Sequence, residues 1–188
     1  PLFHYFAGFS ASPENPGYPQ HANEWSITPP PAGTEVSPND REWRYVFMCA
    51  GSRSYRDYYL RSMSRCMREL KMQELYFDNC WSWFCGNEAH GCGWTDEHGK
   101  KYSTANILGS RELAKNIYRE HRRQYPYGLI VRHISQIPEP PLISFCDALV
   151  DGECFMLDVG RDESYYNVFR PDFFRASFRG EQFGMPSV

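Results

Sequence analysis

The chain has 188 residues, of which 41% are hydrophobic and 23% charged, and its formal net charge is −3 at pH 7. This length and composition suit one globular domain with a sizeable core, so we treat residues 1–188 as a single domain. The slightly acidic balance argues against a general nucleic-acid-binding protein, and no stretch reaches the length of a membrane-spanning helix. Neither nucleic acid nor a membrane is therefore expected as a partner.

The first half of the chain predicts strands and a helix around one long loop. A strand is expected at residues 2–6, a proline-rich loop at about 7–44 and a second strand at 45–49. A helix over about 55–70 carries an apolar stripe at three- and four-residue spacing. It leads into a short apolar run at 75–77, which is too brief for a helix and is typical of a buried parallel strand.

The second half continues the alternation. A loop dense in Cys, Gly and Trp covers about residues 79–102, and a second helix is expected over about 104–124. Strands follow at 129–133 and 142–146, and a short helix begins near 170. Strands that alternate with helices imply parallel βαβ units, so the predicted fold class is α/β.

Ionisable residues stand where three of the predicted strands end. These are Asp78, His133 and Asp147, with Asp151 and Glu153 just beyond the last of them. In a parallel barrel the carboxyl ends of all strands share one rim, where active sites gather. Two carboxylates on such a rim suit glycoside hydrolysis. The alternative is that each residue is only a helix cap or a hydrogen-bond anchor.

A second group of residues could bind a metal. Cys80, Cys85, His90 and Cys92 are crowded into one loop, and soft ligands of this kind can hold zinc. Their spacing lacks the CxxC pair of common zinc ribbons and fingers. A disulfide or buried free thiols among the seven cysteines is the simpler explanation of the pattern.

Several segments, in the same order along the chain, resemble a family of glycoside hydrolases long catalogued as a domain of unknown function and distantly similar to the α-galactosidase-like retaining enzymes. The resemblance covers about residues 45–188. The segments that carry it are Ser54-Tyr55-Arg56-Asp57-Tyr58, Leu75-Tyr76-Phe77-Asp78, Gly91-Cys92-Gly93-Trp94-Thr95-Asp96-Glu97-His98-Gly99, Ser110-Arg111-Glu112-Leu113, Leu142-Ile143-Ser144-Phe145-Cys146-Asp147, Asp151-Gly152-Glu153 and Phe174-Arg175-Ala176-Ser177-Phe178-Arg179-Gly180-Glu181-Gln182-Phe183-Gly184.

The resemblance implies a TIM-like parallel (β/α) barrel with Asp78 as the nucleophile. It also implies an acid/base two strands later, either Asp151 or Glu153, of which Glu153 is preferred. His133 and Asp147 would contact the sugar or tune the acid. A secreted or periplasmic location is suggested by the resemblance alone. The stacking wall for the sugar would consist of Trp81, Trp83 and Trp94.

The sequence supplies about five strands, whereas a complete barrel needs eight strands and about 250 residues. We therefore expect a partial barrel or a fragment, completed by self-association or by further chain segments. The leading hypothesis is a retaining glycoside hydrolase that acts on a carbohydrate without a cofactor or metal. The alternatives are a non-catalytic carbohydrate-binding or scaffolding protein on the same fold, and a zinc-stabilised domain.

Overall fold

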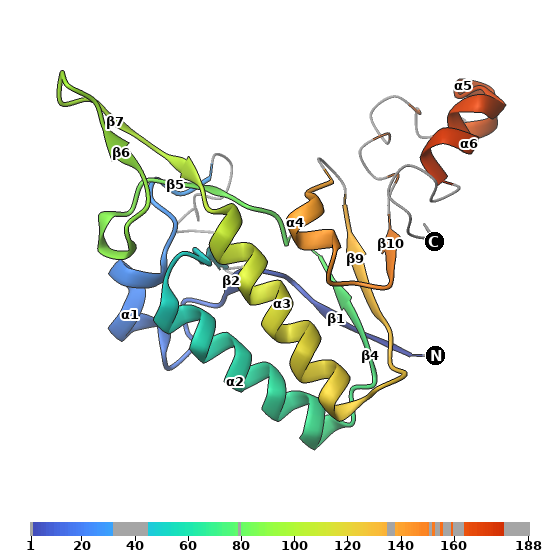
Figure 1. Ribbon diagram of the computed structural model, residues 1–188, viewed down its shortest axis with the longest axis horizontal. Coiled ribbons are helices and arrows are strands. Elements are labelled where there is room, and N and C mark those ends of the chain that lie inside the picture. The colour runs from blue at the N-terminus through green and yellow to red at the C-terminus, as the bar shows by residue number, and fades with distance from the viewer. Residues whose placement is uncertain are drawn as a thin grey trace.

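The computed structural model describes residues 2–31, 45–78, 80–134, 138–150 and 164–178, and the single positions 152, 155 and 159. Its centre is a four-stranded sheet in which every neighbouring pair is parallel (Figure 1). The strands, in spatial order, are β1 (Phe3–Phe6), β4 (Glu74–Phe77), β9 (Ile130–His133) and β10 (Ala148–Val150). The α/β class with a parallel sheet is confirmed, and the described residues form an open sheet rather than a closed barrel.

Two long helices, α2 (Arg53–Leu70) and α3 (Ile107–Gln124), lie side by side along the sheet (Figure 1). Ser52 begins α2 by accepting a hydrogen bond from the Tyr55 amide, and Lys71 ends it in the left-handed conformation. Asn106 caps α3 through the Gly109 amide. The apolar stripe predicted for α2 contributes Met63 and Met67 to the core.

The two faces of the sheet carry different residues because side chains alternate along a strand. Leu75 and Phe77 of β4 and Leu149 of β10 belong to the core cluster that includes Leu113 and Ile117 of α3. Residues of the opposite parity, including Tyr5 and Tyr76, point to the face turned away from α2 and α3. The sheet therefore has a helix-covered face and a second face on which polar and aromatic residues gather.

The remaining elements are short. Antiparallel pairs are formed by β2 (Ser10–Ala11) with β3 (Val46–Phe47), β5 (Phe84–Cys85) with β8 (Thr104–Ala105), and β6 (Trp94–Thr95) with β7 (Lys101–Tyr102). The short helices are α1 (Tyr18–Trp25), η1 (Glu88–His90), α4 (Pro140–Ile143), α5 (Tyr165–Val168) and α6 (Pro171–Phe178). No helix in these described ranges is long and apolar enough to cross a membrane.

Three sequence-based predictions need correction. The strand predicted at 142–146 is wrong, because two prolines start helix α4 there and the strand β10 begins only at Ala148. The strand predicted at 45–49 shortens to β3, which pairs with β2 rather than joining the parallel sheet. The loop predicted at 7–44 contains β2 and α1, and its residues 32–44 lie outside the described part of the chain.

The stability of α3 and of its contact with α2 is expected to depend on pH through Glu120. Hydrogen bonds from Arg123 hold the pKa of Glu120 at about 2, with Ser64 and Gln124 contributing and burial opposing. Because the folded-state pKa is depressed, the stabilisation is complete above the ordinary carboxyl value of 4.5 and is lost as the pH falls from there towards 2.

The corresponding variant is Glu120→Gln. We expect it to lower the free energy of unfolding at pH 7 by about 1–2 kcal/mol, a value reduced for the solvent exposure of Arg123. Between about pH 4.5 and pH 2 the difference from the wild type should shrink. Urea unfolding at several pH values measures this, and a difference that stays constant through that window would contradict the assignment.

Candidate functional site

Asp78 lies at the carboxyl end of β4 between residues of the two neighbouring strands. Its Oδ1 is 2.8 Å from Nδ1 of His133 at the end of β9, and its Oδ2 accepts a hydrogen bond of 2.5 Å from the hydroxyl of Tyr5 on β1. The side chain of Asp78 is 19% exposed and that of His133 is 8% exposed. One carboxylate is thus held by donors from both flanking strands, and it retains some contact with solvent.

The strand register explains this arrangement. Tyr5 lies opposite Tyr76 in the β1–β4 pair, and the Asp78 amide donates to the carbonyl of Phe6 at 2.9 Å. Asp78 has the same parity as Tyr76, so its side chain leaves the sheet on the face turned away from the helices. Rings of Tyr5, Tyr76 and His133 follow one another across that face, with centroids 5.5 and 6.2 Å apart.

The predicted proximity of Asp78 and His133 is therefore present, whereas Tyr5 was not anticipated. Tyr5 is 58% exposed as a residue, yet its hydroxyl is directed at the Asp78 carboxylate. Burial of the hydroxyl raises the pKa of Tyr5, and the hydrogen bond and negative charge of Asp78 raise it further. Tyr5 consequently stays protonated and remains a hydrogen-bond donor at neutral pH.

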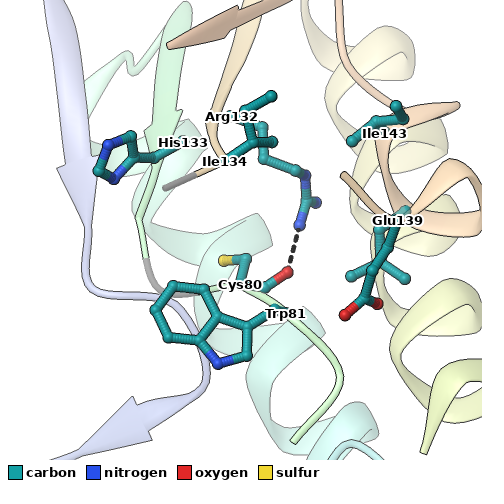
Figure 2. A pocket seen from close by; sticks show the side chains of 8 residues that line it. Cys80, Trp81, Arg132, His133, Ile134, Glu139 and Ile143 are labelled. Carbon is teal, nitrogen blue, oxygen red and sulfur yellow. Dashed lines mark hydrogen bonds between the residues drawn. The ribbon is translucent and has the colours of Figure 1, made fainter. Parts of the chain in front are cut away.

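A pocket opens beside His133 at the carboxyl end of β9 (Figure 2). His133 and Arg132 point in opposite directions there, as alternation along the strand requires. The Arg132 guanidinium is buried and donates to the carbonyl of Cys80 at 3.0 Å, which is the dashed line in Figure 2. The lining residues are Cys80, Trp81, Arg132, His133, Ile134, Glu139, Leu142 and Ile143.

Glu139 also lines this pocket, and the sequence had not singled it out. Its carboxylate oxygens accept hydrogen bonds of 2.9 and 2.5 Å from the amide and hydroxyl of Ser82. Glu139 thereby ties the loop after β4 to the start of α4. Its position in a Pro-Glu-Pro-Pro turn just after the His133 strand was the available signal.

Asp147 lies at the amino-terminal end of the parallel strands, because it precedes β10 instead of following a strand. It accepts a hydrogen bond from the Ile130 amide at the start of β9 and forms an ion pair with Arg122 of α3. The amino ends of parallel strands face away from the rim where Asp78 lies. Asp147 is therefore not brought together with Asp78 and His133.

The three predicted stacking tryptophans are also separated. Trp81 lines the pocket beside His133, and its ring centroid lies 5.0 Å from that of Trp83. Trp83 packs against Phe47 in a second apolar cluster. Trp94 is 55% exposed and stacks on Tyr102 in the β6–β7 hairpin, which projects from the body of the molecule (Figure 1). Only Trp81 borders the pocket at the strand ends.

The proposed acid/base residues, Asp151 and Glu153, lie outside the described residues. The expected separation of about 5–5.5 Å between the Asp78 carboxyl and one of theirs, typical of retaining enzymes, stays a prediction.

A separate group of potential metal ligands combines Cys49, which precedes α2, with three residues of the segment between β4 and α3. Side chains of Cys49, Cys85, His90 and Cys92 place their ligand atoms within 4.8 Å of one another. Cys80, which the sequence grouped with these residues, is absent from this cluster and instead donates to the carbonyl of Asp78. Cys49, more than 30 positions earlier in the chain, takes its place.

Comparison with known proteins gave structural similarities only. A scan against protein-family models and a search of curated proteins found no match. Among solved structures, the chain is similar to the α-galactosidase of Thermus thermophilus in complex with stachyose, with a TM-score of 0.45 and 11% identity over 78% of this chain and 28% of that one.

It is also similar to the glycoside hydrolase domain of PelA from Pseudomonas aeruginosa, with a TM-score of 0.47 and 13% identity over 99% of this chain and 65% of that one. A variant of the same domain gives 14% identity at the same TM-score and coverage. The chain thus spans less than two thirds of each of these chains. At TM-scores below 0.5 these similarities carry no weight for function, which has to rest on the site.

Proposed function

We propose that the chain contributes the nucleophile side of a glycoside hydrolase site, with Asp78 as the nucleophile. The observation that supports this most directly is the position of Asp78 on a parallel sheet. Its carboxylate stands at the carboxyl end of β4, on the face turned away from the helices, and is held by Tyr5 and His133 from both neighbouring strands. Donors aimed at both oxygens stabilise the ionised form that a nucleophile needs.

In the proposed reaction an oxygen of Asp78 attacks the anomeric carbon as the glycosidic C–O bond breaks. A carboxylic acid, Glu153 or Asp151, gives its proton to the departing oxygen. Water then attacks the glycosyl ester, the same carboxylate takes a proton from that water, and Asp78 is released as a carboxylate. Each carboxylate oxygen can accept more than one contact, so the bonds from Tyr5 and His133 leave room for attack.

The neighbours of Asp78 have positioning roles in this proposal. Tyr5 and His133 fix the orientation of the carboxylate, because each hydrogen bond comes from a strand of the rigid sheet. Trp81, beside His133 at the pocket, offers a ring face on which the C–H side of a sugar could stack. Asp147 has no role in this chemistry, because it lies at the amino-terminal end of the strands and Asp78 at their carboxyl end.

The test is hydrolysis of a panel of aryl α- and β-glycosides by the full chain, with the anomeric form of the first product followed by NMR. We expect turnover of at least one glycoside, with retention of configuration. Inversion would rule out Asp78 as a covalent nucleophile. Absence of turnover across the panel would count against the hypothesis that this chain is a glycoside hydrolase.

A non-catalytic carbohydrate-binding role is the second candidate. It is favoured by the hydrogen bonds already accepted by both Asp78 oxygens and by the row of aromatic rings across the same face. Calorimetric titration with oligosaccharides separates the two roles. Binding without turnover, weakened by Tyr5→Ala and Trp81→Ala, would support binding alone.

A further inference from the structure

The segment between β4 and α3 has little regular structure of its own. Its strands β5, β6, β7 and β8 contain two residues each, and η1 contains three. The apolar cluster to which it contributes consists of Ile27, Phe47 and three cysteine side chains, with Trp83 packed against it. Such a segment is short of the buried apolar area that normally stabilises a fold, and small units of this kind commonly depend on disulfides or a metal.

We propose that this segment is held by a structural zinc ion bound to Cys49, Cys85, His90 and Cys92. The proposal is independent of the glycosidase chemistry, in which these residues take no part. Three of the four ligand residues are buried and the fourth is half-buried. Four protein ligands would close the coordination shell, as in structural rather than catalytic zinc sites.

Two distances between ligand atoms are close to those around a tetrahedral ion, and all four ligand atoms lie within 4.8 Å of one another. With Zn–S near 2.3 Å and Zn–N near 2.0–2.1 Å, a tetrahedron places two sulfurs about 3.8 Å apart and a sulfur and a nitrogen about 3.6 Å apart. The Sγ atoms of Cys49 and Cys92 are 3.7 Å apart, and Sγ of Cys85 is 3.3 Å from Nε2 of His90. A disulfide would require about 2.05 Å between sulfurs.

The histidine is oriented for coordination through Nε2. Its Nδ1 is 2.6 Å from the main-chain carbonyl of Glu24, which can only accept a hydrogen bond, so the proton resides on Nδ1. In the neutral imidazole, Nε2, which faces Cys85, then carries the lone pair that a metal ion would need. A carbonyl that fixes the tautomer in this way is the usual second partner of a zinc-bound histidine.

Each sulfur also receives an N–H donor. The Asn106 amide nitrogen lies 2.9 Å from Sγ of Cys92 and 3.6 Å from Sγ of Cys49. Main-chain amides of Gly51 and Asn87 point at Cys49 and Cys85, each at 3.4 Å. Donors directed at all three sulfurs offset the negative charge that three thiolates and one zinc ion would carry together.

Gly51 is required for this packing. A β-carbon at that position would lie 1.9 Å from the Asn106 amide nitrogen and 3.0 Å from Sγ of Cys92. Any side chain there would therefore displace the donor that connects Cys92 and Cys49. The close approach of this backbone to the sulfurs is explained if Gly51 and Asn106 serve the coordination of an ion.

Zinc is the metal that this ligand set favours. Three thiolates with one imidazole suit zinc, a borderline-soft ion that is almost always tetrahedral in structural sites. Hard cations such as Mg²⁺ and Ca²⁺ prefer oxygen ligands. The ligands come from two separated parts of the chain, Cys49 before α2 and the other three before α3. One ion would hence join the β4–α3 loop to the start of α2.

The test is elemental analysis of the full chain, expressed with zinc in the medium and purified without chelator. We expect one zinc per chain, reduced at least about tenfold by Cys85→Ser or Cys92→Ser and unchanged by Cys80→Ser or Cys66→Ser. Cys80 is the most informative control because it is buried and close in sequence, yet not part of the cluster. Zinc lost equally in Cys80→Ser, or stoichiometric iron or copper in its place, would overturn the proposal.

Two further measurements do not depend on ligand variants that could fail to fold. The chelated, reduced wild type should bind one Co²⁺ and show the visible bands of a tetrahedral thiolate site. Asn106→Asp keeps an N-cap for α3 but removes the N–H donor, and we expect it to weaken zinc binding about 10- to 100-fold. An octahedral cobalt spectrum, or a disulfide between Cys49 and Cys92 detected by mass spectrometry, would contradict the zinc site.

Discussion

Replacement of Asp78 by Asn is expected to lower kcat/KM on a responsive aryl glycoside by about 10³-fold or more, because the amide cannot attack the anomeric carbon. The variant should still fold, since Asn keeps the shape of the side chain and one hydrogen-bond acceptor. Thermal unfolding followed by circular dichroism tests this point. Residual activity within about tenfold of the wild type would remove Asp78 from the chemistry.

A second measurement on the same residue distinguishes a nucleophile from a residue that merely orients others. Asp78→Ala opens space for a small anion, so added azide should restore glycoside cleavage and give a glycosyl azide of inverted anomeric configuration. Tyr5→Phe serves as the matched variant, because it removes one donor to Asp78 while keeping the ring. We expect it to lower kcat about 10-fold and to gain nothing from azide.

Replacement of Asp147 by Ala is expected to lower the free energy of unfolding by about 2–4 kcal/mol while leaving the activity per folded molecule unchanged. The substitution leaves the Arg122 guanidinium and the Ile130 amide without the carboxylate that both contact. The side chains of Arg122 and Asp147 are only 22% and 25% exposed, so water replaces these contacts incompletely. Chemical denaturation measures the loss.

The matched control for Asp147 is Glu112→Gln, which breaks an exposed ion pair of α3 with Arg111. There we expect a change within about 0.5 kcal/mol, as for other surface pairs. If Asp147→Ala instead lowered kcat/KM at unchanged stability, Asp147 would have the sugar-contacting role that the resemblance implied. Substitution of Asp78 is thus expected to lower activity at unchanged folding, whereas substitution of Asp147 is expected to lower stability at unchanged activity.

Strands β1, β4 and β9 and the helices α2 and α3 could be predicted from the sequence, because strong periodicity is a local property. The apolar run at 75–77 and the stripe of α2 both carry their burial pattern within a few residues. The meeting of Asp78 with His133 followed from the rule that parallel strands share one rim, and the structure places them 2.8 Å apart.

Other features depend on contacts that no local pattern contains. The apolar residues at 142–146 fit a strand, but the two prolines before them favour a helix. Asp147 therefore precedes the next strand and lies at the amino-terminal end of the sheet's strands. Tyr5 reaches Asp78 only because β1 pairs with β4, so that Tyr5 lies opposite Tyr76, 71 residues later. Cys49 likewise joins Cys85 and Cys92 across a long separation, so a search for short motifs selected Cys80 in its place.

The site around Asp78 also has a consequence for the order of folding. Its hydrogen bonds join residues 73 and 55 positions apart, so the site exists only after three strands have paired in the correct register. Contacts of such long range carry a large loop-closure cost and form late, whereas α2 and α3 can form locally. During refolding, the helical signal should therefore recover before the Tyr5–Asp78–His133 contacts do. A ribosome-bound chain that ends before β9 would contain Asp78 without its contact to His133.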